Sequence, residues 1–321
     1  MTDSAARSFT ARLGLALPIV QAPMAGFQGV GMAAAVSGAG ALGSLPGAAL
    51  APQALRDAVA ELRRDAGLPV NLNFFCHAVP AADPAREAAW REALRPYYDE
   101  LGLSFSAIAN GPGRLPFGAD AADAIESLRP EVVSFHFGLP PAPLLERVRR
   151  SGAQVWASAT TVAEAQWLAA RGVDAIIAQG LEAGGHRGVF LPEGGPFELD
   201  GQLRTHALLT AVLQAVRVPV IAAGGIADAD GVAAALRLGA SAVQLGTAFL
   251  LCTEATTTAV HRAALQGEAA GRTALTNVFS GRPARGIVNR LMRELGPMSA
   301  LPPAFPSAVN ALAPLRAGGE Q

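Results

Sequence analysis

Residues 154–179 read QVWASATTVAEAQWLAARGVDAIIAQ, and this stretch contains one complete strand–helix–strand unit. QVWAS at 154–158 and DAIIAQ at 174–179 are short apolar runs, as expected of buried strands. Between them, TVAEAQWLAARG at 161–172 is amphipathic, begins with a threonine cap and stops at Gly172. Two strands joined by a helical crossover favour parallel pairing.

The same alternation continues in both directions along the chain. Eight strand–helix units close naturally into an α/β (β/α)8 TIM barrel, although a doubly wound open sheet is an alternative. A further amphipathic stretch is PQALRDAVAELRRDAG at 52–67. The other six apolar runs are PIVQAP (18–23), ALGSL (41–45), VNLNFF (70–75), VVSFHF (132–137), VPVIAAG (218–224) and SAVQLG (241–246).

Two stretches do not fit the barrel count. The barrel is expected over residues 1–75 and 131–252, with a helical insertion at 76–130 after the third strand. Residues 253–321 follow the eighth strand and contain a helix, a Gly/Pro/Arg-rich piece and a Pro-rich tail. Loops after barrel strands gather at the mouth, so this C-terminal extension is expected to cover the active site.

The composition excludes several classes of protein. Of 321 residues, 51% are hydrophobic and the net charge is −1 without a basic stripe, which disfavours nucleic acid as a partner. Cys76 and Cys252 lie far apart, so neither a disulfide framework nor a metal site is expected. There is no apolar run of about 18 residues and no signal-peptide pattern, which predicts a cytoplasmic protein without a membrane span. All 25 basic residues are arginine, which excludes lysine-dependent Schiff-base chemistry and Walker-type phosphate loops.

Glycines follow the last two expected strands. AAGGIAD at 222–228 presents Gly224 and Gly225, and QLGTAFL at 244–250 opens a short helix at Gly246 and Thr247. Phosphate sites of TIM barrels are frequently built after strands seven and eight, beside a short helix. The sequence therefore predicts a ligand that carries a phosphate group.

Amide side chains mark the ends of other strands. Asn71 and Asn73 share one face of their strand, and Gln179 and Gln244 end strands six and eight. QAPMAG at 21–26 places Pro23 and Met24 at the mouth. Buried amides need hydrogen-bond partners, and the edge of a heterocycle supplies donors and acceptors. Amides and glycines with few charges fit a flavin better than a sugar.

Two histidines have different contexts. In QGLEAGGHRGVF (179–190), His186 follows two glycines that allow close backbone approach, which favours acid–base chemistry. His136 ends VVSFHF, where either a hydrogen-bonded core role or a functional one is open. Cys76 and His77 are adjacent on a strand and would point to opposite faces, so they are not expected to form a nucleophile–base pair.

QAPMAG, VNLNFFCH, QGLEAGGHRG, AAGGIAD and QLGTAFL, in this order, resemble the nitronate monooxygenase family (formerly 2-nitropropane dioxygenases), and SGRPARGIVNR at 280–290 continues the likeness. The resemblance to its bacterial class implies an FMN-dependent flavoenzyme that oxidises a small nitronate or nitroalkane with dioxygen to a carbonyl compound and nitrite. It implies His186 as the active-site histidine and His136 as a second catalytic histidine. The motifs assign cofactor binding to Ala22, Pro23, Met24, Asn73, Gln179, Gly184, Gly185, Gly224, Gly225, Gln244, Leu245, Gly246 and Thr247.

One departure and several alternatives remain open. Phe305 stands where the family offers a tyrosine, and Tyr97 and Tyr98 are the only tyrosines of the chain. The same barrel superfamily contains NAD(P)H:quinone reductases and enoyl-ACP reductases, which are the alternative function. A phosphate-sugar isomerase or lyase without flavin, and a flavin-binding barrel that has lost catalysis, are further alternatives. The physiological substrate is not fixed by the motifs, and a homodimer is left open.

Overall fold

The computed structural model describes residues 2–64, 67–109, 113–191 and 199–319. The chain divides into two compact units. The barrel unit consists of Met1–His77, Pro116–Ala183 and Gly188–Thr257, and the second unit consists of Ala78–Leu115, Gly184–Arg187 and Thr258–Gln321.

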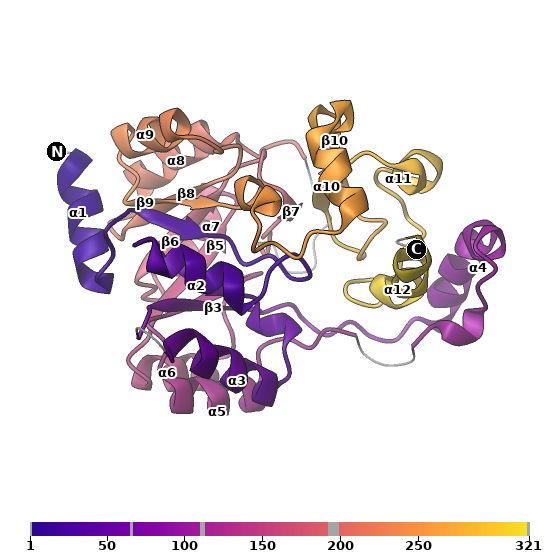
Figure 1. Cartoon of the computed structure of the whole chain (residues 1–321), viewed down its shortest axis with the longest axis horizontal. Helices are drawn as coiled ribbons and strands as arrows, with labels where there is room; N and C mark the ends of the chain where they lie inside the picture. The colour runs from indigo at the N-terminus through magenta and orange to yellow at the C-terminus, as the bar shows by residue number, and fades with distance from the viewer. Residues whose placement is uncertain (1, 65–66, 110–112, 192–198, 320–321) are drawn as a thin grey trace. The chain divides into compact units, whose positions relative to one another are not determined.

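In the described part of the barrel unit, eight strands form one parallel sheet in the order β1-β9-β8-β6-β5-β4-β3-β2 (Figure 1). Every strand lies within, or within one residue of, a run expected from the sequence, because apolar runs of this length are buried on both faces. The strands are β1 Ile19–Gln21, β2 Gly43–Leu45, β3 Val70–Phe75, β4 Val132–His136, β5 Gln154–Ala159, β6 Ala175–Gln179, β8 Val220–Ala223 and β9 Ala242–Leu245.

The sheet nearly closes on itself between β1 and β2. A parallel bridge joins Val20 to Leu42, and the Gln21 N–H donates to the Leu42 carbonyl over 2.9 Å. Beyond the bridge, the Gln21 side chain takes the place of main-chain hydrogen bonds between β1 and β2. Its Oε1 accepts from the Ser44 N–H at 3.0 Å. This closure confirms the TIM barrel, and the doubly wound sheet is wrong.

Helices surround the barrel strands (Figure 1). At the start of α7, Thr161 accepts from the Glu164 N–H at 3.2 Å, which confirms the expected threonine cap. The helices are α1 Thr2–Leu13, α2 Val30–Gly38, α3 Pro52–Arg63, α5 Ala119–Leu128, α6 Ala142–Arg150, α7 Val162–Ala169, α8 Thr205–Ala215 and α9 Ala229–Arg237, with 3-10 turns η1 Gly47–Ala49 and η3 Thr247–Leu251.

Several apolar clusters stabilise the barrel unit, and the two largest pack around its strands. Side chains on the outer faces of the strands, such as Leu72 and Phe74, pack against the helices. Val132, Trp156 and other inward-facing side chains form the second cluster, where Phe9 of α1 contacts Trp156 with ring centroids 5.3 Å apart. Burying each such side chain contributes about 1.5–3 kcal/mol, so these clusters hold the strand ends in fixed places.

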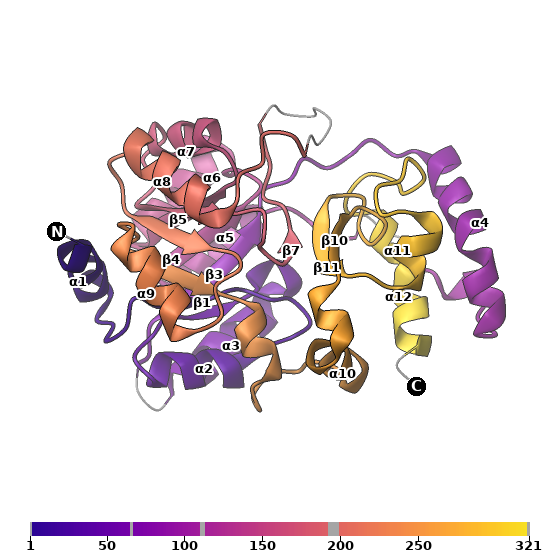
Figure 2. The ribbon, with the colours of Figure 1, turned by 90° about the horizontal axis from the view of Figure 1, so that it is seen from above.

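The second unit contains a small antiparallel sheet with strand order β10-β11-β7 among its described residues (Figure 2). Its third strand is only Gly185–His186, taken from the chain that follows β6. The elements are α4 Pro84–Glu100, η2 Phe105–Ala107, β7 Gly185–His186, α10 Ala259–Gln266, η4 Glu268–Gly271, β10 Thr273–Thr276, β11 Ala284–Ile287, α11 Arg290–Leu295 and α12 Ala308–Gly319.

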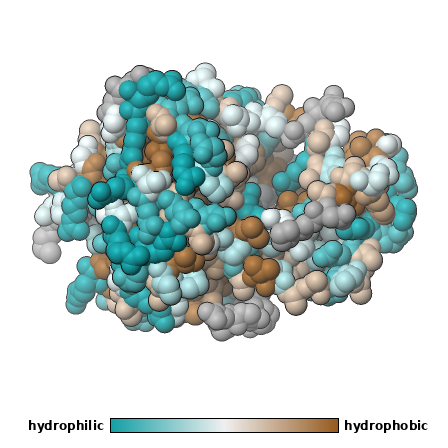
Figure 3. Space-filling model, turned by 90° about the horizontal axis from the view of Figure 1, so that it is seen from below, coloured by the Kyte–Doolittle hydropathy of each residue, from teal (hydrophilic) through white to brown (hydrophobic). Residues whose placement is uncertain are grey.

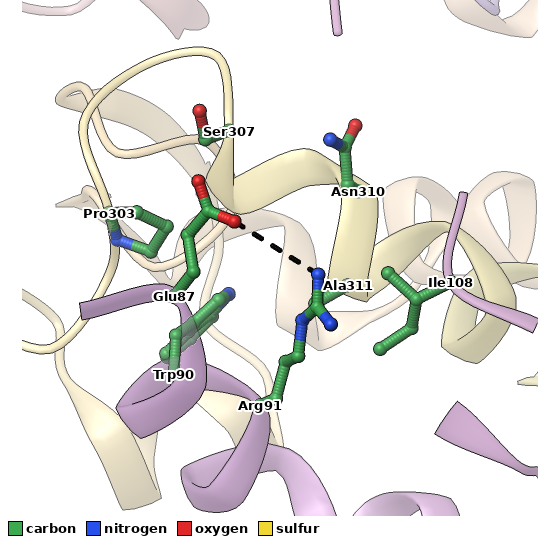
Figure 4. Close-up of a pocket in the computed structure, with 8 residues that line it drawn as sticks. All are labelled: Glu87, Trp90, Arg91, Ile108, Pro303, Ser307, Asn310 and Ala311. Carbon is green, nitrogen blue, oxygen red and sulfur yellow. Dashed lines mark ion pairs between the residues drawn. The ribbon is translucent and has the colours of Figure 1, made fainter. Parts of the chain in front are cut away.

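Helices α4 and α12 pack together within the second unit. Trp90 of α4 is buried and its Nε1–H donates to the Ala308 carbonyl at 3.3 Å, while the Tyr98 hydroxyl donates to the Ala311 carbonyl at 2.6 Å. Beside Trp90 lies a small cavity, shown in Figure 4. It is lined by Glu87, Trp90, Arg91, Ile108, Pro303, Ser307, Asn310 and Ala311, and no predicted site residue is among them.

The observed units differ in two ways from the expected ranges 76–130 and 253–321. Helix α5 at Ala119–Leu128 packs on α3 and α6, so it belongs to the barrel unit and the inserted segment is Ala78–Leu115. The C-terminal part, expected as helix and loop, also contains β10 and β11. TALT and ARGI are short and mixed in polarity, so they give no clear strand periodicity.

The face drawn in Figure 3 is mainly hydrophilic or neutral, with hydrophobic residues in separate small patches. Charged residues make up 16% of the chain. Among the residues that the structure describes, no helix is long and apolar enough to span a membrane.

Candidate functional site

Asn73 occupies the predicted position near the carboxyl end of β3. Its amide nitrogen donates to Ser134 of the neighbouring strand, to Oγ at 2.9 Å and to the carbonyl at 3.2 Å. The side chain is 7% exposed. Since both bonds use the amide nitrogen, they fix the orientation of the amide group at the mouth of the barrel.

His136 ends β4, and its Nδ1 lies 3.0 Å from Oγ of Ser158 on the adjacent strand β5. The imidazole packs among aromatic rings, with Phe75 at 5.8 Å and Phe137 at 4.5 Å between centroids. Phe137 is buried with φ +70°, a left-handed conformation that is rare for a bulky residue. Such a conformation persists only where the surrounding structure holds it in place.

A hydrogen bond between Gln179 and Gly188 links the end of β6 to the point where the chain re-enters the barrel unit. Gln179 Oε1 accepts from the Gly188 N–H at 2.8 Å. A Cβ at Gly188 would lie 2.9 Å from Cε1 of His136 and 3.3 Å from Cβ of Ser158. Only glycine leaves room there, so the main chain passes directly against the His136 ring.

Glu164 fixes the next few residues of that returning chain. Its carboxylate is completely buried and accepts from the Phe190 N–H at 2.7 Å and the Leu191 N–H at 3.2 Å. It also accepts from Thr160, from the N–H at 2.6 Å and from the hydroxyl at 2.8 Å. Hydrogen bonds to a charged acceptor are the strong ones, so this part of the loop is held firmly.

The predicted glycine turn follows β8. Gly224 and Gly225 have φ +118° and +67°, and a Cβ on Gly225 would lie 2.9 Å from Cβ of Glu182. The Glu182 carboxylate accepts from Thr205, from its N–H at 2.8 Å and its hydroxyl at 2.9 Å. Both conformation and space therefore require glycine here, as expected for close approach to a ligand.

The end of β9 lies beside the end of β1. The Ala22 N–H donates to the Leu245 carbonyl at 2.7 Å, and a Cβ at Gly246 would lie 3.7 Å from the Met24 sulfur. Met24 is held in turn by Gln28, whose Oε1 accepts from the Met24 N–H at 3.1 Å. The 3-10 turn η3 begins at Thr247, which confirms the predicted short helix.

The predicted residues Gly184, Gly185 and His186 belong to the second unit. Gly185 and His186 form β7 and pair with Arg285 and Ala284 of β11. His186 Nε2 lies 2.8 Å from the Ser280 hydroxyl, and the Phe305 ring stands edge-on to the imidazole with centroids 5.3 Å apart. The phenyl ring thus packs on the histidine.

A model of the family described as "Nitronate monooxygenase" matches residues 7–321. The chain is 45% identical to the nitronate monooxygenase of Pseudomonas aeruginosa, over 91% of this chain and 81% of that protein. It is 44% identical to the enzyme of the same name from Paraburkholderia phytofirmans, over 97% and 85%.

The chain belongs to the nitronate monooxygenase family. It is therefore an oxidoreductase of a flavin-dependent family. Solved structures agree with this assignment. Nitroalkane oxidase from Streptomyces ansochromogenes superposes with a TM-score of 0.83 at 38% identity, covering 95% of this chain and 86% of that chain. FabK from Thermotoga maritima follows with 0.66 at 28% identity, covering 89% and 76%.

The residues of this nitronate monooxygenase family member fit a flavin. Gln244 Oε1 is buried and has no hydrogen-bond partner among the described residues. A buried acceptor without a donor costs about 1–3 kcal/mol, and an imide N–H of a flavin ring would satisfy it. The Gly224–Gly225 turn has positive φ at both residues, a backbone form in which exposed N–H groups can bind an anion such as a phosphate group.

Sequence reasoning missed several polar residues of the site. Gln28 and Ser44 form a buried hydrogen-bonded group with Gln21, and Asn71 donates to Ser44 Oγ at 2.9 Å. Ser280, which contacts His186, was also missed although its motif was noted. In the parts of the chain that the structure describes, no cluster of His, Cys, Asp or Glu could hold a metal ion.

Proposed function

We propose that this chain catalyses the FMN-dependent oxidation of alkyl nitronates by dioxygen, giving a carbonyl compound and nitrite. The observation that carries the proposal is the buried Gln244 oxygen at the end of a barrel strand, which has no hydrogen-bond partner in the described part of a chain of this family. FMN, when bound, supplies the redox chemistry, accepting electrons from the substrate and passing them to dioxygen.

The chain's own residues bind and orient the cofactor. The glycine turn at Gly224 and Gly225 and the start of η3 suit one phosphate group, whereas FAD would need room for a second phosphate and an adenylate. Asn73 and Gln179 present oriented amides. The full proposed set is Ala22, Pro23, Met24, Asn73, Gln179, Gly184, Gly185, Gly224, Gly225, Gln244, Leu245, Gly246 and Thr247.

Two histidines carry the remaining chemistry in this proposal. His186 hydrogen-bonds the nitro group or removes the α-proton of a neutral nitroalkane, leaving the C–H electron pair in the nitronate. A nitronate is already deprotonated and needs no base. The chain has no lysine, so we assign to His136 the stabilisation of negative charge on the reduced cofactor.

The test begins with the visible spectrum of the purified protein. A yellow protein that releases FMN by mass analysis, and bleaches on anaerobic addition of a small nitronate, supports the proposal. Release of FAD, a colourless protein, or a flavin that does not respond to the nitronate contradicts it.

A pair of glycine variants tests the phosphate position. Gly225→Asp should abolish FMN retention, because its side chain meets Glu182 and its charge repels a phosphate. Gly14→Asp is the matched control, since Gly14 has φ +66° but nothing within 4 Å of its Cβ position. Equal retention in both variants would remove Gly225 from the cofactor site.

The likeness to FabK keeps a reductase activity as the second candidate. In that case NADH or NADPH would reduce the flavin, and a quinone or an enoyl thioester would reoxidise it. Stopped-flow reduction by NADH, compared with reduction by a nitronate, separates the two. Faster reduction by NADH would favour the reductase.

A further inference from the structure

Ser280 begins the SGRPARG motif, which none of the roles proposed above uses. It lies in the turn between β10 and β11 and is 3% exposed. Its hydroxyl is 2.8 Å from Nε2 of His186, although 94 positions separate the two in the sequence. A buried serine therefore meets the catalytic histidine of the proposed function at a defined ring nitrogen.

The turn that carries Ser280 is firmly built. Asn277 donates to the Ser299 carbonyl at 2.7 Å and accepts from the Ser299 N–H at 2.9 Å. Gly281 has φ +85°, and a Cβ there would lie 2.1 Å from the Pro303 carbonyl oxygen. The turn therefore has very little freedom to move the Ser280 hydroxyl.

His186 is restrained from its own side as well. Its neighbour Arg187 donates its N–H to the Pro283 carbonyl at 2.8 Å, which continues the β7–β11 pairing. The Phe305 ring lies edge-on to the imidazole, with an interplanar angle of 76°. Backbone and ring contacts together keep Nε2 directed at Ser280.

The hydrogen bonds at Ser280 determine where the imidazole proton lies. A serine hydroxyl has one proton and two lone pairs. The Arg282 carbonyl lies 3.2 Å from the hydroxyl and can accept its proton, and the Arg282 N–H donates to its oxygen at 3.3 Å. A carbonyl cannot donate and an N–H cannot accept, so all three contacts are satisfied only when His186 donates through Nε2–H.

We propose that Ser280 is a positioning residue that holds neutral His186 in the Nε2–H tautomer, so that Nδ1 is the atom that takes the α-proton from a nitroalkane. The inference rests on the proposed function. In the step, the C–H bond breaks, its electron pair enters the nitro group, and an Nδ1–H bond forms. The resulting imidazolium keeps its Nε2–H bond to Ser280, which becomes charge-assisted and stronger.

The tautomer can be observed without any turnover. Protein labelled with ¹⁵N-histidine contains five histidines, and His186→Asn identifies the signals of His186 in a long-range ¹H–¹⁵N spectrum. We expect the wild-type signals of neutral His186 to show a protonated Nε2, and Ser280→Ala to shift population toward the Nδ1–H form. A wild-type Nδ1–H tautomer, or no change in Ser280→Ala, would overturn the proposal.

Matched variants distinguish this role from a general loss of rigidity in the protein. Ser158→Ala removes the serine beside His136 and should leave the His186 signals unchanged. Ser280→Thr keeps a hydroxyl and should restore the Nε2–H tautomer. A similar response of His186 to Ser158→Ala, or failure of Ser280→Thr to restore the tautomer, counts against the assignment.

Turnover gives the second readout. Ser280→Ala should slow neutral nitroalkanes about tenfold more than pre-formed nitronates, equivalent to about 1.4 kcal/mol. Equal loss on both substrates would overturn the link to proton removal. If the wild-type protein oxidises neither substrate, the proposed function fails, whereas the tautomer spectrum still decides whether Ser280 sets the His186 proton.

Discussion

Each of the two histidines with proposed roles has a serine partner, but the two pairs are built differently. His136 and Ser158 lie at the ends of adjacent parallel strands of the barrel and meet through Nδ1. His186 and Ser280 lie on a two-residue strand and a turn of the second unit, and meet through Nε2. The sheet ladder fixes the first pair, whereas glycine and asparagine contacts in a turn fix the second.

The difference matters for the chemistry that each ring can perform. In the first pair, the main chain at Gly188 passes against Cε1 of His136, so that ring is packed as part of the barrel wall. In the second pair, the Ser280 hydroxyl lies 2.8 Å from Nε2 of His186, and the Phe305 ring stands edge-on to the imidazole. The first ring is therefore held by packing within the barrel unit, and the second by a hydrogen bond to a turn of the second unit.

Replacing His186 should have the largest effect among the variants that test the difference between the two pairs. His186→Asn should retain FMN but lower the turnover of neutral nitroalkanes by about 10²- to 10⁴-fold, because a general base is lost. Pre-formed nitronates should lose less. Steady-state assays on both substrates measure the ratio of the two losses in turnover. Equal losses would mean that His186 only binds the substrate, and unchanged rates would exclude it from the mechanism.

Gly188→Ala should disturb the first pair and spare the second. Its methyl group would lie 2.9 Å from Cε1 of His136, so the ring must shift, at a cost of about 1–3 kcal/mol in the free energy of unfolding. Gly286→Ala, whose Cβ position is open, should change stability by less than about 0.5 kcal/mol. Urea titrations compare the variants, and equal stabilities would show that Gly188 is not sterically required.

His136→Ala should lower the reduction potential of the bound flavin without releasing FMN. A cationic imidazole near the reduced cofactor would be lost, and charge interactions are stronger where water is excluded. Ser158→Ala should change the potential in the same direction but by less, since the ring itself remains. Potentiometric titration measures the midpoints. Identical midpoints in the wild type and His136→Ala would leave His136 as a core histidine.

The smallest effect concerns Cys76, whose N–H donates to the His136 carbonyl at 2.8 Å. Burial raises the pKa of the Cys76 thiol well above its usual value, so it stays protonated at neutral pH. Its alkylation should therefore remain slow up to about pH 9, whereas a free thiol ionises near pH 8.5. Mass spectrometry after timed iodoacetamide treatment measures this. Rapid modification of folded protein at pH 8 would contradict it.

The raised pKa of the Cys76 thiol also predicts that the stability of the protein depends weakly on pH. Above about pH 8.5 the unfolded chain loses the Cys76 proton while the folded chain keeps it. The folded state then binds more protons, so the free energy of unfolding falls as the pH rises. In urea titrations between pH 8 and 10, Cys76→Ser should reduce the fall in the free energy of unfolding with pH. An unchanged fall would mean that other groups cause it.

The barrel and the first pair could largely be predicted from the sequence. All eight strands were found from apolar runs, and parallel register places His136 of β4 close to Ser158 of β5. Gly225 follows β8 in the AAGGIAD motif, and its positive φ is a conformation that favours glycine. These features depend on short-range patterns and on the regular spacing of a parallel sheet.

The second pair could not be predicted in the same way. Two residues, Gly185 and His186, are too few to show a periodicity, and Ser280 comes close only through β11 and its turn. The contact of Phe305 with His186 depends on the same long-range packing. Buried His77 packs against Phe75 and Phe137, and its contact with Phe137 joins residues that are far apart in the sequence.

The second unit is assembled from three separate stretches of chain, one of which is the four-residue segment Gly184–Arg187. No single cut can therefore excise it as an independent fragment, and fusing its C-terminal stretch to another barrel would transfer neither β7 nor His186. Such an arrangement is more readily explained by the gradual lengthening of loops than by the joining of a ready-made module. Transplanting His186 would require grafting a barrel loop together with the strand that it pairs with.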